Sequence, residues 1–144
     1  MCGITGVFNH PKAFEQVTTA LSILHNRGKD GVGISNFHEV QHHHDIHKFY
    51  PLPGKCIVGH SLHAVVDHIP QPLKGKGVLV ANCEIYNWKK LNATYKFKAK
   101  NDAELLLCLL DTFGVEKLDE LEGVYAFAYW NNEEEGIYVD IVSG

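Results

Sequence analysis

The sequence has few features that would point to secretion, to a membrane or to a nucleic-acid partner. Its net charge of -4 over 144 residues provides no basic excess for binding nucleic acid or an anionic membrane. No apolar run reaches the length of a membrane-spanning helix. The first residues lack the basic and apolar regions of a signal peptide, so we expect none. The four cysteines form no C-x-x-C pair, and we expect free thiols in a reducing cytoplasm.

The apolar content is sufficient for one globular domain with its own core. Apolar residues make up 45 % of the chain and charged residues 21 %. The spacing of the apolar residues predicts a mixed α/β layered domain with mainly antiparallel strands. The expected strands cover residues 2–8, 32–37, 57–60, 78–81, 124–130 and 136–142. The expected helices cover residues 14–24, 86–91 and 105–113, with a shorter helical piece at 118–121.

Cys2 is the first candidate for chemistry. Removal of Met1 would leave a thiol and a free α-amino group on the same residue. In model peptides the amine has a pKa near 8 and the thiol about 8.5, so the amine can act as a general base at neutral pH without a histidine. Gly3 and Gly6 would allow a substrate to approach the backbone closely. The alternative interpretation is a small buried apolar residue at the start of a strand.

Two further segments carry polar groups next to expected elements. Asn82 and Cys83 follow the strand at 78–81, where a side-chain amide and a backbone N–H are suitable donors to an oxyanion. The alternative there is a turn that caps a short helix. Asn101 and Asp102 precede the leucine-rich helix and can cap it. Asp102 could also bind the α-ammonium group of an amino acid, and both roles are compatible.

The number of histidines suggests a metal site, but the residues around them do not form a metal-ligand pattern. Residues 38–50 are polar and form either a loop or a solvent-facing hairpin, and five histidines lie there without a cysteine or carboxylate pattern. We therefore favour a solvated segment over a metal-binding protein and expect no metal. Three other histidines, His60, His63 and His68, are spaced around Val65 and Val66 and could line a pocket.

Several segments, in this order and spacing, resemble one known family. They are Cys2-Gly3-Ile4-x-Gly6, Arg27-Gly28-x-Asp30-Gly31, Gly59-His60, Gln71-Pro72-Leu73, Asn82-x-Glu84-Ile85-Tyr86-Asn87, Asp102-x-Glu104 and Leu121-x-Gly123-x-Tyr125-Ala126-Phe127-Ala128. The chain resembles the class II glutamine amidotransferase domain of the N-terminal nucleophile hydrolase fold. It is similar in particular to the amino-terminal domain of glutamine-dependent asparagine synthetases. The resemblance covers essentially the whole chain, residues 1–144.

The resemblance implies both a fold and an activity. The fold is α+β, a four-layer αββα sandwich with the nucleophile on the first strand, and the family's domain continues past the final residues here, so the last strands are expected to be missing. The activity is hydrolysis of L-glutamine to glutamate and ammonia through a thioester, without a cofactor. The ammonia would pass to an asparagine synthetase-like partner or domain.

The resemblance also implies roles for individual residues. Cys2 is the nucleophile and base, and Asn82 with the backbone N–H of Cys83 forms the oxyanion hole. The remaining residues that it implies in substrate binding are Arg27, Val66, Glu84 and Asp102.

Two positions depart from the family pattern. Leu62 stands where the family usually has an arginine that clamps the glutamine α-carboxylate, so this bidentate anchor is absent unless His63 or Arg27 replaces it. Cys83 stands where the family has glycine, so the backbone there must avoid positive φ.

These departures leave a second interpretation open. The chain could be a degenerate, non-catalytic module that keeps the amidotransferase fold for amino-acid sensing or partner binding. We expect the working glutaminase, because Cys2, Asn82 and Asp102 are intact. The apolar strand expected at 136–142 also predicts self-association, as a homodimer, through an exposed sheet edge.

Overall fold

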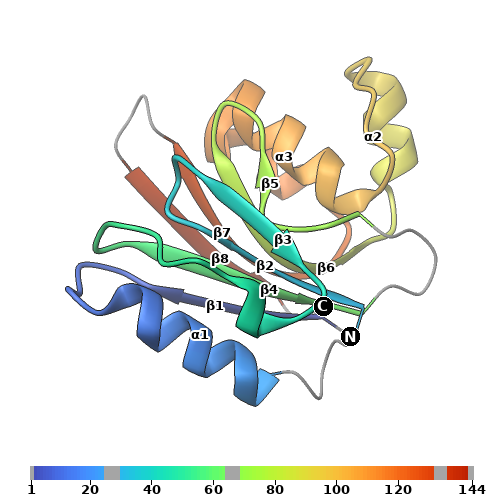
Figure 1. The fold of residues 1–144 in the computed structure, drawn as a ribbon. Coiled ribbons are helices and arrows are strands. Elements are labelled where there is room, and N and C mark those ends of the chain that lie inside the picture. Colours follow the sequence, from blue (N-terminus) through green and yellow to red (C-terminus); the bar gives the residue numbers. More distant parts are fainter. Residues whose placement is uncertain (1, 25–29, 64–68, 132–135, 143–144) are drawn as a thin grey trace.

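The computed structural model describes residues 2–24, 30–63, 69–131 and 136–142, which form two antiparallel sheets with helices on their outer faces (Figure 1). Each sheet has four strands. Sheet A contains, in spatial order, β1 (Gly3–Val7), β4 (Ile57–Leu62), β2 (Gly31–Ser35) and β3 (Val40–His43). Sheet B contains, in spatial order, β5 (Leu73–Lys74), β6 (Val78–Ile85), β7 (Gly123–Asn131) and β8 (Gly136–Val142).

Helices lie between these strands along the chain. The α-helices are α1 (Ala13–Leu24), α2 (Trp88–Thr94) and α3 (Asp102–Phe113). Two 3-10 helices are η2 (Ile46–Lys48) and η3 (Gly114–Glu120). No helix among the described residues is long and apolar enough to cross a membrane.

Helix α1 covers the outer face of sheet A. Its fully buried residues Ala13, Val17 and Leu21 recur every four positions and therefore form one stripe. This stripe packs against Ile34 of β2 and Ile57 of β4 in one apolar cluster. Burial of a side chain of this size contributes about 1.5 to 3 kcal/mol, so the stripe holds α1 on the sheet.

Helix α3 covers sheet B in the same way and has well-defined ends. The side chain of Asn101 accepts a hydrogen bond from the backbone N–H of Glu104, which caps the first turn. Gly114 closes the last turn with a φ of 65°. The apolar face of α3 packs on Leu79 and Phe127 of sheet B.

A third apolar cluster lies between the two sheets. It joins Val58 of β4 to Val78 and Val80 of β6, with Phe37 beside them. The order through the molecule is therefore α1, sheet A, sheet B and α3 (Figure 1). The prediction of a mixed α/β domain with antiparallel strands is confirmed.

The structure corrects the end of one expected strand. β6 does not stop at Ala81 but continues to Ile85, so Asn82 and Cys83 lie inside the strand and not in a turn after it. The reason is pairing: Asn82 lies opposite Ala126 of β7, and the ladder continues beyond it. The extended conformation of Cys83 agrees with the expectation that its backbone avoids positive φ.

Other expectations hold with shifted boundaries. The polar segment at 38–50 contains β3, which forms a hairpin with β2, so the hairpin alternative is the correct one. The short helix expected at 86–91 begins at Trp88. β8 pairs with β7 and with no other described strand, so it is an edge of sheet B. Self-association through this edge stays a prediction.

One contact between the sheets requires a glycine. A Cβ atom on Gly33 of β2 would lie 1.8 Å from the backbone oxygen of Gln71, so the Gln71 backbone occupies the space of the missing side chain. Gln71 in turn reaches sheet B, because its Oε1 accepts a hydrogen bond from the backbone N–H of Ala81 at 2.7 Å. Gly33 thereby allows the segment before β5 to join the two sheets.

We predict that Gly33→Ala lowers the free energy of unfolding by roughly 3 kcal/mol, because the new Cβ must displace backbone rather than a flexible side chain. The matched control is Gly31→Ala in the same strand, where the nearest atom to the new Cβ is 3.7 Å away. This change should alter stability by less than about 0.5 kcal/mol. Urea denaturation of both variants measures the difference, and equal stabilities would contradict the prediction.

Candidate functional site

The thiol of Cys2 lies against the chain just after β4 (Ile57–Leu62). Cys2 directly precedes β1, whose first residue Gly3 pairs with Ser61 of β4. This register places Sγ of Cys2 against the peptide groups of His63, just beyond β4: the His63 N–H donates to Sγ at 3.5 Å, and Sγ lies 3.8 Å from the His63 carbonyl oxygen. The thiol is half-buried, so it is accessible to a small substrate.

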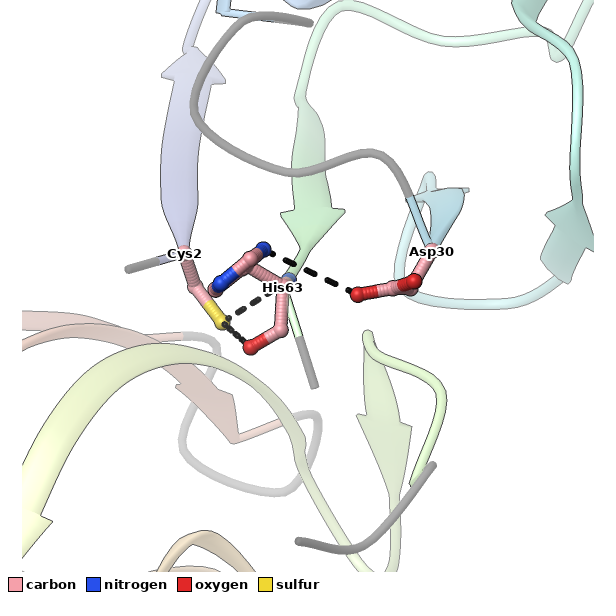
Figure 2. Close-up of polar contacts among 3 residues, drawn as sticks. All are labelled: Cys2, Asp30 and His63. Carbon is pink, nitrogen blue, oxygen red and sulfur yellow. Dashed lines mark hydrogen bonds and ion pairs between the residues drawn. The ribbon is translucent and has the colours of Figure 1, made fainter. Parts of the chain in front are cut away.

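Asp30 completes this group of side chains (Figure 2). It precedes β2 and its N–H donates to the carbonyl oxygen of Leu62 at 2.9 Å, next to the Gly31–Leu62 pair of the ladder. Its Oδ2 lies 3.7 Å from Nδ1 of His63. Figure 2 shows the His63 ring directed toward the Asp30 carboxylate while its backbone contacts Cys2.

Asn82 faces this group from sheet B. Side chains alternate along a strand, and Val78 and Val80 of β6 point into the layer between the sheets. Asn82 is two residues farther along and shares their face, as does Glu84 after it. The Asn82 amide is therefore directed toward sheet A, at the end of β6 where the chain leaves the core and becomes accessible.

The backbone N–H of Cys83 points to the open edge of β6. The neighbouring odd-numbered amides show the direction: Ala81 donates to Gln71 and Ile85 donates to Asp102, both away from β7. Tyr86, an even-numbered residue, instead donates to the carbonyl oxygen of Glu122, on the side of β7. The N–H of Cys83 consequently lies between two satisfied donors, and no described residue accepts from it.

The thiol of Cys83 has a different environment from that of Cys2. It lies on the α3 side of sheet B. Burial, followed by the charge of Asp102 and a hydrogen bond to it, raises the pKa of the Cys83 thiol far above its usual range. Cys2 contributes a smaller effect in the same direction. The Cys83 thiol therefore stays protonated at neutral pH, and only its backbone N–H is suited to bind an anion.

Asp102 stands at the same edge, at the start of α3. Its Oδ2 accepts from Ile85 N–H at 3.1 Å and its Oδ1 accepts from Ala103 N–H at 2.9 Å. A carboxylate accepts about four hydrogen bonds, so Asp102 retains capacity for an ammonium group. Asn101, not Asp102, is the residue that caps α3.

Sequence comparison adds to this geometry. Residues 1–140 match the model of a family described as glutamine amidotransferase domain. The chain belongs to this family. The glutamine-hydrolyzing asparagine synthetase B of Escherichia coli is 31 % identical to this amidotransferase domain, over 96 % of the chain and 24 % of the relative.

Two other relatives give the same result. A putative glutamine-hydrolyzing asparagine synthetase of Methanocaldococcus jannaschii is 28 % identical over 93 % of the chain and 27 % of the relative. The glutamine-hydrolyzing asparagine synthetase 1 of Bacillus subtilis is 28 % identical over 96 % of the chain and 22 % of the relative. The amidotransferase domain thus spans about a quarter of the length of these curated relatives.

A cavity of about 180 Å³ lies along β2 and β3 of this amidotransferase domain. Asp30 and Leu62 line it, and Asp30 is also the residue that pairs with His63. Residues His42 to His44 of β3 and the following turn line the opposite side. Leu62 therefore borders open space at the position where the family pattern has a longer, charged side chain.

The histidines are arranged differently from the expectation. His60 does not line a pocket: it is fully buried between the sheets, and neither ring nitrogen has a hydrogen-bond partner among the described residues. The cavity is lined instead by members of the polar run expected to be solvated, and Nε2 of His42 lies 3.1 Å from the carbonyl oxygen of Pro72. Hairpin pairing of β3 brings them there, which composition could not indicate.

The candidate residues separate into two groups. The structure brings Cys2, Asn82, Cys83 and Asp102 to one end of the sheets, with Glu84 exposed next to them. Arg27, Val66 and His68 lie outside the described residues.

The contact of Cys2 with the His63 backbone and the pairing of His63 with Asp30 were missed. The sequence places Asp30 in the Arg27-Gly28-x-Asp30-Gly31 segment, and it suggests His63 as a pocket residue or a carboxylate anchor and not as a partner of Asp30. Pairing of β1 and β2 with β4 creates both contacts.

We predict that His60 makes stability fall with acidification. Burial lowers the pKa of His60 from 6.5 to about 4. The unfolded state therefore binds a proton first, so the stabilisation is complete above pH 6.5 and is lost as the pH falls toward 4. The loss amounts to about 3 kcal/mol over this window.

His60→Leu removes the titrating group at similar volume, and the difference in unfolding free energy between parent and variant should change by this amount from pH 7 to pH 4. The exposed His47 provides the control as His47→Gln. A difference that does not vary with pH would show that the buried ring does not titrate as described.

Proposed function

We propose that this domain hydrolyses L-glutamine to glutamate and ammonia through a thioester on Cys2. The observation that carries the proposal is the open backbone N–H of Cys83, which shares one end of the molecule with the Cys2 thiol and the inward-facing Asn82 amide. An accessible thiol beside two convergent donors is the arrangement that acyl transfer requires. Membership of the glutamine amidotransferase family supports an amide as the substrate.

The reaction follows from these groups once Met1 is removed. The α-amine of Cys2 takes the thiol proton, and Sγ attacks the carbonyl carbon of the glutamine side chain. The resulting oxyanion accepts hydrogen bonds from the Asn82 amide and the Cys83 N–H. The ammonium form of the amine protonates the leaving nitrogen, the C–N bond breaks and ammonia departs. Water then attacks the thioester, which releases glutamate and restores the thiol. No cofactor is needed for either half.

Substrate recognition uses the charges around these donors. Glu84 and Asp102 are the carboxylates proposed to hold the α-ammonium group of glutamine, and Asp102 retains acceptor capacity at the edge of β6. Arg27 and Val66 are proposed to contact the substrate as in the family pattern. The thiol of Cys83 does not compete as nucleophile, because burial raises its pKa.

The wider assignments are also proposals. The order of α1, sheet A, sheet B and α3 supports the four-layer αββα sandwich of N-terminal nucleophile hydrolases. Because the curated relatives are asparagine synthetases about four times longer, we propose that the ammonia acceptor is a synthetase domain or subunit in the cytoplasm. A homodimer through the edge strand β8 is the proposed assembly.

Asn82→Ala should lower kcat for ammonia release by roughly 10² to 10³, because one oxyanion donor is lost while ground-state contacts remain. The Michaelis constant should change far less. Asn92→Ala is a matched control, since the Asn92 side chain bonds only to the backbone of Ala99 among the described residues. A loss of less than about threefold in the Asn82 variant would remove Asn82 from the oxyanion hole.

The same assay includes Cys2→Ala, which should abolish turnover and labelling by a glutamine-like diazo ketone. Mass spectrometry should locate the label on Cys2 and also show that Met1 is absent. Label on Cys83 would overturn the assignment of the nucleophile.

A second candidate function rests on Leu62. This residue borders the cavity without offering a charge, which favours a non-catalytic module that binds an amino acid or a partner. The two functions differ in one respect: the module would show binding without ammonia release.

Leu62→Arg should lower the Michaelis constant for glutamine roughly tenfold, because a guanidinium can bind a carboxylate through two hydrogen bonds. The cavity next to Leu62 provides room for the longer side chain. Leu62→Met adds length without charge and should leave the constant unchanged within about twofold. Absence of any gain in the arginine variant would show that another residue binds the carboxylate.

A further inference from the structure

His63 and Asp30 form a pair whose role the proposed reaction does not include. Nδ1 of His63 lies 3.7 Å from Oδ2 of Asp30, and their side chains are 49 % and 35 % exposed. An ion pair with this exposure contributes little to global stability. Its location is what makes it informative, because the backbone of His63 is the group that contacts Sγ of Cys2 (Figure 2).

The His63–Asp30 pair lies at the end of the β2–β4 ladder. Gly31 and Leu62 form the last backbone pair, and Asp30 N–H donates to the Leu62 carbonyl oxygen just before it. Beyond this point the backbone of His63 has left the sheet. Of the described contacts, the Asp30 carboxylate is the one that restrains the His63 side chain.

We propose that the His63–Asp30 pair positions the nucleophile: it fixes the peptide group of His63 so that its N–H remains directed at Sγ of Cys2. This inference rests on the proposed function, in which Cys2 is the attacking group. His63 is a positioning residue and not a catalytic one, because it acts through its backbone contact with Cys2. The N–H that contacts Sγ can donate to the thiolate, and the neighbouring carbonyl oxygen accepts from the thiol.

The geometry explains why a weak pair has a measurable effect. Sγ is held by two long contacts, at 3.5 and 3.8 Å, to a single residue. A small displacement of His63 therefore removes both contacts together. Since misplacement of a reacting group by about 1 Å can lower a rate by roughly 10², the orientation of His63 affects the reaction more than it affects folding.

The test measures the reactivity of Cys2 with and without a substrate. Iodoacetamide alkylation of the Cys2 peptide, followed by mass spectrometry in the processed protein, requires no glutamine. His63→Leu and Asp30→Asn should each slow this alkylation roughly threefold to tenfold. His63→Lys places an amino group opposite the Asp30 carboxylate and should restore at least half of the parent rate. The double variant should be no slower than the slower single variant, because both changes break one pair.

Glutamine hydrolysis gives a second, independent readout. In His63→Leu, kcat should fall by the same factor while the Michaelis constant stays within about twofold. His47→Gln, an exposed histidine in η2, is the matched control and should equal the parent in both assays. Thermal melting of each variant reports whether the fold is intact, and alkylation rates are compared at temperatures where it is.

The outcomes distinguish the two proposals. If the parent releases no ammonia, the proposed function fails, and the alkylation series alone decides the role of the pair. Unchanged alkylation in both single variants overturns the positioning role, as does a loss that lysine at position 63 does not restore. A Michaelis constant that rises while kcat and alkylation remain unchanged also overturns it, because His63 would then bind the substrate directly.

Discussion

The approach of the Gln71 backbone to Gly33 is the contact on which the placement of the site depends. Gln71 occupies the space of a missing side chain in sheet A, and its amide oxygen accepts from Ala81 in sheet B. This contact fixes the spacing between the two sheets. It also occupies the backbone N–H of Ala81, the last odd-numbered N–H of β6 before Cys83. Asp102 uses the N–H of Ile85. The donor left between them is the N–H of Cys83, the group proposed to bind the oxyanion, because the N–H groups on either side already have acceptors.

The position of Cys2, the proposed nucleophile, depends on the register between β1 and β4. Gly3 lies opposite Ser61, which brings Cys2 to the level of the residues that leave β4. A slip of one residue would direct Sγ to the α1 side of sheet A, away from Asn82. Cys2 contacts backbone atoms of His63, and the pairing of β1 with β4 brings these two residues side by side.

The sequence was sufficient for much of the local structure and for the family of the domain. Helix α3 could be predicted because Asn101, the leucine spacing and Gly114 all act within one segment. The extent of β6 could not, because β7 supplies the partner that keeps Asn82 and Cys83 extended. Burial of His60 could not be predicted from the sequence either. Its depth depends on packing of one sheet on the other, which no local pattern contains.

The proposed reaction and the proposed substrate binding therefore depend on different structural features, strand pairing for the first and single side chains for the second. The proposed oxyanion donor, the Cys83 N–H, is a backbone group oriented by strand pairing, and a cysteine in place of glycine is compatible with that orientation because β6 is extended there. Recognition of the substrate instead depends on single side chains, and Leu62 borders a cavity where a charged group would otherwise lie. We expect a substitution at such a position to change substrate binding, because strand pairing and not the Leu62 side chain holds Cys2 and the Cys83 N–H in place. The departure at Leu62 is therefore expected to affect substrate recognition and not the proposed reaction at Cys2.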